Sequence, residues 1–182
     1  MIKRTDNPGD VDTSAMSQWE RAISGNWYCY AADKTLENRI EASKGAPLPG
    51  IHPSCNVIEP ISIDYPERFV VGENTLLNHH LETLSAGMVT IGKNCFIGPH
   101  ARFYTPNHHI TDLAFRRAGW QYDAPITVGD DVWFGGSVVV CPGVTIGNNV
   151  VVAAGSVVTK DFPSNVIIGG NPARIIKEIE GE

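Results

Sequence analysis

Residues 125–161 read PITVGDDVWFGGSVVVCPGVTIGNNVVVAAGSVVTKD, and this stretch decides the fold. An apolar residue recurs at every sixth position, and five of these six residues are β-branched. The positions are Val128, Phe134, Val140, Ile146, Val152 and Val158. A period of six fits neither a helix nor an alternating strand. It is explained if each hexapeptide forms one short strand and one turn, so that three hexapeptides complete one triangular coil.

The same period continues upstream of this stretch. Its upstream positions are Val71, Leu77, Ile91, Ile97 and Phe103. A small residue often follows, because a tight corner leaves little room for a side chain. These small residues are Gly72, Gly92, Gly98, Gly129, Gly135, Gly147 and Ala153. The register slips between about Thr83 and Ile91, where we expect a small irregularity. The sequence therefore predicts an all-β solenoid of hexapeptide repeats.

Residues 16–50 lack the repeat and carry helix signals instead. Ser17 and Glu20 have the spacing of a capping box, and Gly25 is placed to end that short helix. A second helix is predicted over residues 33–44, before a Pro- and Gly-rich linker. We therefore expect three parts: a disordered polar tail over 1–15, a helical cap with its linker over 16–50, and the β-helix over 51–182.

The repeat breaks between Phe103 and Val128, and residues 104–127 form a polar and aromatic insert. A long loop that leaves a rigid solenoid usually carries function, because the scaffold positions it without needing its residues for packing. We expect this extruded loop to carry the chemistry through His108, and we interpret the adjacent His109 as a solvated neighbour.

Composition excludes several other functions. A formal net charge of −6 argues against a dedicated nucleic-acid or membrane-surface binder, since both favour a basic face. No apolar run is long enough to span a bilayer, and the first residues do not resemble a secretory signal. The four cysteines form no Cys-x-x-Cys pair, which predicts reduced thiols, no zinc site and a cytoplasmic protein. They are Cys29, Cys55, Cys95 and Cys141.

Several blocks of sequence carry a family resemblance. They are Val71-Gly72-Glu73-Asn74 with Leu77-Asn78 and Val89-Thr90-Ile91-Gly92, then Tyr104-Thr105-Pro106-Asn107-His108, then residues 125–161, and finally Gly169-Gly170-Asn171-Pro172-Ala173-Arg174. Together they resemble the hexapeptide-repeat acetyltransferases of the maltose and galactoside O-acetyltransferase group. The resemblance covers about residues 16–180 and is densest after residue 125.

The resemblance implies a left-handed parallel β-helix and a homotrimer with an active site between neighbouring prisms. It implies an O-acetyltransferase that uses acetyl-CoA as co-substrate, requires no metal, and takes a sugar or another small alcohol as acceptor. His108 matches the histidine that removes the proton from the acceptor hydroxyl, and imidazole suits this role near neutral pH. Gly136 matches the backbone N–H donor for the developing oxyanion, and Asn78 matches a further residue of the catalytic site.

Other matched positions divide between the two substrates. The coenzyme side is implied for Trp133, Gly135, Ala154, Thr159, Lys160 and Arg174. Lysine and arginine suit phosphate groups there. The acceptor side is implied for Asn78, His80, Ser85, Tyr30 and Asp64. Tyr30, His80 and Ser85 depart from the polar and acidic residues usual in the sugar enzymes, which predicts a less polar alcohol as acceptor.

Alternatives remain open on the sequence. The acceptor could be a secondary metabolite or a xenobiotic alcohol, and the acyl group could be longer than acetyl. A metal hydratase like the γ-type carbonic anhydrases would need converging histidines, for which His80, His100 and His108 are candidates. A β-helix without activity, serving as a binding or assembly module, is a further alternative. No serine or cysteine is recognisably paired with His108, so we expect direct transfer in a ternary complex.

Overall fold

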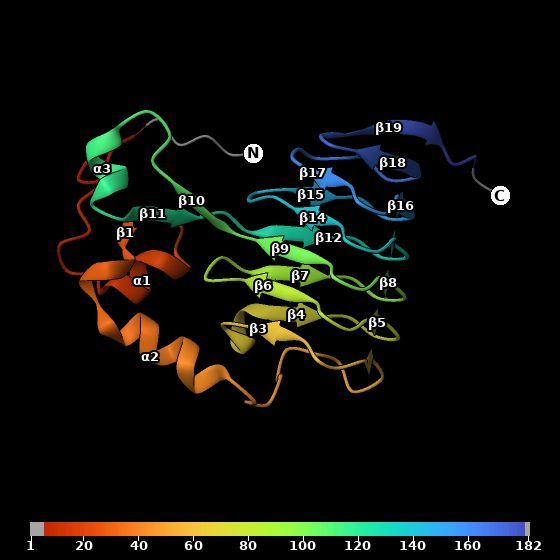
Figure 1. Cartoon of the computed structure of the whole chain (residues 1–182), viewed down its shortest axis with the longest axis horizontal. Helices are drawn as coiled ribbons and strands as arrows, with labels where there is room; N and C mark the ends of the chain where they lie inside the picture. Colours follow the sequence, from red (N-terminus) through yellow and green to blue (C-terminus); the bar gives the residue numbers. More distant parts are fainter. Residues whose placement is uncertain (1–5, 181–182) are drawn as a thin grey trace.

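Three parallel sheets form the faces of a triangular prism in the computed structural model, which describes residues 6–180 (Figure 1). The prism is a left-handed β-helix of about 6 turns. The first face contains β4 (Phe69–Val71), β7 (Val89–Ile91), β12 (Ile126–Val128) and β15 (Thr145–Ile146). The second contains β2 (Asn56–Val57), β5 (Leu76–Leu77), β8 (Phe96–Ile97), β13 (Trp133–Phe134), β16 (Val150–Val152), β18 (Val166–Gly170) and the antiparallel β19 (Ala173–Glu178). The third contains β3 (Ser62–Ile63), β6 (Glu82–Leu84), β9 (Arg102–Tyr104), β14 (Val139–Val140) and β17 (Val157–Val158).

The hexapeptide residues fill the interior of the prism as predicted. Each of the six positions from Val128 to Val158 is at most 2% exposed. Val128 pairs with Ile146 of the next coil, which is the third hexapeptide position after it, so one coil is three hexapeptides. Phe103 and Phe134 stack one above the other with ring centroids 5.8 Å apart. Burial of these aliphatic and aromatic columns is the main stabilising contribution to the prism.

The predicted irregularity lies in the turn between β6 and β7. Val71 pairs with Ile91 and Thr83 pairs with Phe103, so the coils that contain this turn are longer than three hexapeptides. The coils from Val128 to Val158, by contrast, keep the strict repeat, whereas the last coil is two residues shorter, since Val152 pairs with Ile168. Two extra residues enter this turn, while the core positions before and after it stay aligned. The prediction of a slip in this region is confirmed.

The small residues after the repeat positions lie where neighbouring coils approach closely. A Cβ at Gly135 would lie 2.6 Å from the backbone nitrogen of Ala154 on the next coil. A Cβ at Gly98 would lie 2.7 Å from the carbonyl oxygen of Gly135. Since the obstacle in both cases is backbone, only glycine fits without moving the coils. This confirms the reason given for the glycines in the sequence.

A helical cap precedes the prism. It consists of α1 (Gln18–Ile23), β1 (Tyr28–Cys29), the 3-10 helix η1 (Tyr30–Ala32) and α2 (Lys34–Ser43). Ser17 and Glu20 form the predicted capping box, and Asp33 caps α2. Arg68, at the end of the 3-10 helix η2 (Pro66–Arg68), fastens the cap to the prism. Its guanidinium donates to the carbonyl oxygens of Ala86 and Ile23, each at 3.2 Å.

The segment before α1 differs from the predicted loose tail over residues 1–15. Residues 1–5 lie outside the described residues. The indole Nε1 of Trp27 donates to the carbonyl oxygen of Asp6, and Asn7 Oδ1 lies 2.9 Å from Nε2 of His109. Arg21 donates to the carbonyl oxygen of Thr13 at 2.7 Å. Side chains of the cap and the insert therefore form hydrogen bonds with backbone and amide oxygens of residues 6–15. The polar composition of this segment did not indicate such contacts.

The insert is more ordered than an extruded loop. It contains β10 (Pro106–His108), the helix α3 (Leu113–Arg117) and β11 (Trp120–Asp123). Strand β11 pairs with both β10 and β1, which joins the insert to the cap in a three-stranded antiparallel sheet. The interpretation of His109 as solvated is wrong. Its ring is 7% exposed and stacks on Trp27 with centroids 5.2 Å apart. Within the described residues, no helix has the length and apolar character needed to cross a membrane.

Candidate active site

An apolar groove of about 620 Å³ runs across the outside of the second face. Strands β5, β8 and β13 and the turns after them form it. Its lining includes four predicted site residues together with exposed aromatic rings: Asn78, Gly135, Gly136, Trp133 and Phe96. The rings of Phe96 and Trp133 are 57% and 56% exposed. Their exposure on a folded surface is typical of a surface that binds an apolar group.

One backbone N–H group beside the groove indicates which chemistry the groove can support. Among the described residues, the backbone N–H of Gly136 donates to no protein acceptor, although its carbonyl oxygen accepts from Gly155 at 2.8 Å. Ala154 lies beside Gly135 on the next coil and is exposed, although it does not itself line the groove. A free N–H at the edge of an apolar groove can stabilise a negative oxygen held there.

His108 lies at the end of β10, beside the cap, and its side chain is exposed. Its Nδ1 lies 3.2 Å from the carbonyl oxygen of Trp120 on the paired strand β11. Because a carbonyl oxygen can only accept, Nδ1 carries the proton and Nε2 carries the lone pair. In the neutral tautomer that this contact selects, Nε2 is the nitrogen that can accept a proton.

The groove and His108 do not meet within one chain. His108 is not among the residues that line the groove. In the view of Figure 1, β10 and β11 lie at the left beside the cap helices, while β5 and β8 lie at the right. A single described chain therefore carries the proton acceptor and the groove on different sides.

The chain matches known transferases in sequence. Residues 125–160 match the family described as bacterial transferase hexapeptide (six repeats), and residues 88–101 match the hexapeptide repeat of succinyl-transferase. A putative acetyltransferase of Saccharomyces cerevisiae is 42% identical over 149 residues, which cover 80% of this chain and 76% of that protein. The chain belongs to the hexapeptide-repeat acetyltransferases. The family predicted from the sequence is therefore confirmed.

Solved structures of similar acetyltransferases have the same fold. The maltose O-acetyltransferase of Clostridium difficile 630 is 37% identical with a TM-score of 0.84, covering 92% of this chain and 100% of that chain. A galactoside acetyltransferase, solved in complex with coenzyme A, is 32% identical with a TM-score of 0.78, covering 91% and 92%. The predicted β-helix of this acetyltransferase is confirmed by these likenesses.

The residues predicted to meet the nucleotide and phosphates of the coenzyme lie toward the C-terminal end of the prism. Thr159 and Lys160 follow β17, and the ammonium of Lys160 lies 5.5 Å from the ring centroid of Phe162. Arg174 is exposed on β19, where its guanidinium donates to the carbonyl oxygen of Ala173 at 2.8 Å. None of these three lines the groove.

The residues predicted for the acceptor lie in separate places. Asn78 lies in the groove and Tyr30 belongs to the cap, whereas Asp64 and Ser85 are buried beneath the cap and His80 lies at another corner of the prism. Asp64 Oδ1 accepts from the backbone N–H of Tyr65 at 2.9 Å, and from the backbone N–H and hydroxyl of Ser85 at 2.8 and 2.9 Å. Ser85 is fully buried. In one chain, therefore, Asp64 and Ser85 bind each other.

Burial controls the charge of Asp64. Removal from water raises the pKa of this carboxyl to about 6, although its hydrogen bonds with Ser85 and Tyr65 lower it. Asp123, which is 2% exposed, adds repulsion, and burial raises the pKa of Asp123 as well. Asp123 accepts from the hydroxyls of Tyr28 and Thr105. Sequence reasoning missed Asp123, because a single aspartate before β12 gives no signal of burial.

A cluster of histidines lies at another corner of the prism. His80 is exposed and lines a separate hollow with His100, beside Glu82 and Arg102. Among the described residues, His79, His80 and His100 form one group with a spacing compatible with metal binding, and His108 is not part of it. The set of His80, His100 and His108 weighed for a hydratase is therefore not brought together in one chain.

Proposed function

We propose that this acetyltransferase moves the acetyl group of acetyl-CoA directly to the hydroxyl of a small alcohol, with His108 as general base. The observation that carries the proposal is the hydrogen bond from His108 Nδ1 to the carbonyl oxygen of Trp120, which leaves Nε2 free to take a proton. No described serine, threonine or cysteine side chain hydrogen-bonds to His108, which favours a ternary complex over a covalent acyl-enzyme.

Gly136 is proposed to stabilise the reaction's oxyanion. As the hydroxyl oxygen attacks the thioester carbonyl, negative charge develops on the carbonyl oxygen, and the unpaired N–H of Gly136 can donate to it. The C–S bond then breaks, and the proton held by His108 can pass to the departing CoA thiolate. Asn78, in the same groove, is proposed to hold the acceptor near this point.

A homotrimer is proposed because the site is incomplete in one chain. His108 and the groove lie on different sides of the molecule, so the base must come from a neighbouring copy. An outward apolar column on the second face supports this assembly, since such surfaces are usually covered. The column consists of Leu76, Phe96, Trp133, Val151 and Ile167, aligned by strand pairing.

Acetyl-CoA is proposed to lie along the prism between two copies. Trp133 and Gly135 would contact the acyl end, Ala154 the pantetheine arm, and Thr159, Lys160 and Arg174 the nucleotide and phosphates. The solved galactoside acetyltransferase with coenzyme A supports the proposal, as does the position of Ala154 beside Gly135 on the next coil. All four cysteines are unpaired, which supports a reducing compartment such as the cytoplasm.

The acceptor is proposed to be less polar than a sugar. Tyr30, His80 and Ser85 stand at positions where the resemblance predicts more polar or acidic contacts, and Asp64 is engaged with Ser85. The test is release of free CoA thiol from acetyl-CoA across a panel of sugars and apolar alcohols. Alcohol-dependent release supports the function. Maltose or galactosides as the best acceptors would contradict the preference for less polar alcohols, and the absence of release with every alcohol would contradict the function.

Replacing Gly136 with serine is expected to preserve activity. A Cβ at this position would have no neighbour closer than 3.6 Å, and the proposed oxyanion donor is the backbone N–H, which serine keeps. Initial rates should give a kcat within about threefold of the wild type, whereas loss of such a donor costs about 10²–10³-fold. A loss of that size in a variant that unfolds at the wild-type temperature would argue against this donor.

Replacing Ala154 with leucine is expected to weaken acetyl-CoA binding. Ala154 is exposed, so the larger side chain can leave the fold intact while it obstructs the proposed pantetheine path. The KM for acetyl-CoA should rise by about 10-fold or more, the size expected for overpacking a contact. Ala42→Leu, at an exposed position on α2, is the matched control and should leave KM unchanged. An unchanged KM in Ala154→Leu would remove Ala154 from the coenzyme path.

A further inference from the structure

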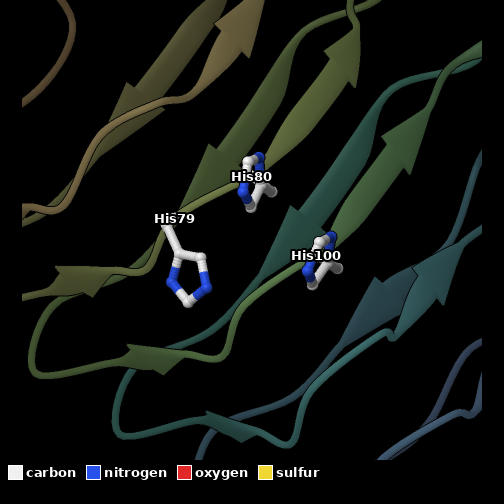
Figure 2. Close-up of side chains that lie close together, drawn as sticks. All are labelled: His79, His80 and His100. Atoms are coloured by element: carbon white, nitrogen blue, oxygen red, sulfur yellow. The ribbon is translucent and has the colours of Figure 1, made fainter.

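Of the three histidines in this cluster, only His80 is predicted to contact the acceptor, and none takes part in the proposed proton or acyl transfer. His79 and His80 follow β5, and His100 occupies the same corner as His80 one coil later. Figure 2 shows the rings of His80 and His100 side by side in the same orientation, with the His79 ring next to them. The rings of His80 and His100 are stacked with centroids 4.8 Å apart, and the His79 centroid is 5.1 and 5.7 Å from theirs.

The backbone holds these residues in a fixed arrangement. His80 and His100 have positive φ angles of 60° and 59°, and the backbone N–H of His100 donates to the carbonyl oxygen of His79 at 3.1 Å. The other positive-φ corners of the prism carry asparagine, aspartate, serine or glycine. Strand pairing on both sides of the corner keeps the coils in register, so the three imidazoles are brought together by the solenoid itself.

The tautomer of His79 follows from its contacts. Asn78 Oδ1 accepts from the backbone N–H of His79 at 2.9 Å, which identifies that amide atom as the oxygen. His79 Nδ1 lies 2.7 Å from the same oxygen, so Nδ1 carries the proton and Nε2 carries the lone pair. An imidazole whose inner N–H is held by an amide or carboxylate oxygen is the usual arrangement of a metal-binding histidine.

We propose that His79, His80 and His100 form a binding site for a divalent transition-metal ion of the Zn²⁺ class. Each histidine offers one nitrogen, and the three atoms lie within 4.8 Å of one another. Tetrahedral coordination at Zn–N distances of about 2.0–2.1 Å would place them about 3.3 Å apart, which small rotations of half-buried and exposed rings can reach. A fourth position is left for water.

The ligand chemistry selects the class of ion. Imidazole nitrogens favour zinc, copper and nickel, whereas magnesium and calcium require oxygen ligands. Arg102 is a nearby cation that would repel a bound metal ion. Its guanidinium lies 3.6 Å from the carboxylate of Glu82, and this negative charge offsets the repulsion. The proposed acetyl transfer has no step that uses a metal, so the site does not depend on that function.

The test is titration of the full chain, made without a polyhistidine tag and freed of metal by a chelator. Zn²⁺ binding is followed by calorimetry, and Co²⁺ binding by visible absorption. We expect one Zn²⁺ per chain, no displacement by excess Mg²⁺, and a Co²⁺ spectrum without thiolate charge-transfer bands. Failure to bind Zn²⁺ at micromolar concentration, or a thiolate band that reports binding at cysteine, would overturn the proposal.

His100→Asn is the decisive variant, because asparagine occupies equivalent positive-φ corners at Asn74, Asn94 and Asn149 and should preserve the fold. His100 also has no predicted contact with either substrate. Its replacement should weaken Zn²⁺ binding at least ~10-fold, since loss of even an outer partner of a metal ligand has an effect of that order. His80→Asn tests the same corner one coil earlier and should give a similar loss.

His52→Asn is the matched control, because His52 is exposed and lies outside the cluster, with its Nδ1 2.9 Å from the Ser54 hydroxyl. Zn²⁺ should raise the unfolding temperature of the wild type and of His52→Asn, but not that of His100→Asn, because only a folded state that binds the ion is stabilised. Equal Zn²⁺ affinity in His100→Asn and His52→Asn would show that the ion binds elsewhere.

Discussion

His108→Ala is expected to lower kcat for alcohol-dependent release of CoA thiol by about 10²–10⁴-fold. The variant removes the proposed base, so the hydroxyl must attack the thioester without losing its proton to the protein. The KM for acetyl-CoA should change little, because the proposed role of His108 is to take the proton of the acceptor and not to bind the coenzyme. Since the side chain is exposed, its truncation should also leave the unfolding temperature near that of the wild type.

The measurement is steady-state kinetics with the best acceptor, together with thermal unfolding of each variant. His52→Ala removes an exposed histidine of the prism and serves as the control for nonspecific loss. Wild-type kcat in His108→Ala would exclude the histidine from the chemistry. A higher KM with an unchanged kcat would indicate that His108 binds substrate, since removal of a group that acts only in the transition state lowers kcat.

Asp64→Asn is expected to increase stability above pH 6 and to have a smaller effect near pH 4. Burial raises the pKa of Asp64 from 3.8 to about 6, so the folded protein binds a proton that the unfolded chain has lost. The stability associated with this proton is fully present below pH 4 and is lost as pH rises through about 6. The difference between the folded and unfolded pKa values of Asp64 corresponds to about 3 kcal/mol of unfolding free energy at neutral pH.

Asparagine keeps an oxygen that can accept from Tyr65 and Ser85, and it removes the charge that opposes Asp123. The measurement is urea unfolding of both proteins from pH 4.5 to 8, compared as a difference so that other titrating groups cancel. Asp131→Asn, an exposed position with a positive φ that asparagine tolerates, is the control. A difference between wild type and Asp64→Asn that does not vary with pH would contradict the raised pKa.

The fold could be predicted because its signals are local and repeated. The six-residue period places Val128 through Val158 in the core regardless of what lies elsewhere, and the capping box at Ser17 is complete by Glu20. The slip near Thr83 was visible for the same reason. Each of these features depends on spacing along the chain, which the sequence contains directly.

Contacts between distant segments could not be predicted in the same way. His109 is buried because Trp27 and Asn7, from the opposite end of the sequence to the repeats, cover it. His79 and His100 become neighbours through one coil of the prism, whose length includes the slip between β6 and β7. The carboxyl of Asp64 is controlled by Ser85 and Asp123, and neither carries a motif.

Because the coils stack along one axis, the number of coils sets the length of the prism. Neighbouring strands in a sheet lie about 4.8 Å apart, so a chain that gained or lost one whole coil after β13 would move its C-terminal strands by that step. The interior columns would stay in register, as they do across the turn between β6 and β7, where two extra residues leave the paired core positions aligned. The distance along the prism axis from Trp133 to the C-terminal strands is therefore set by the number of coils, and residues added within a turn leave it unchanged.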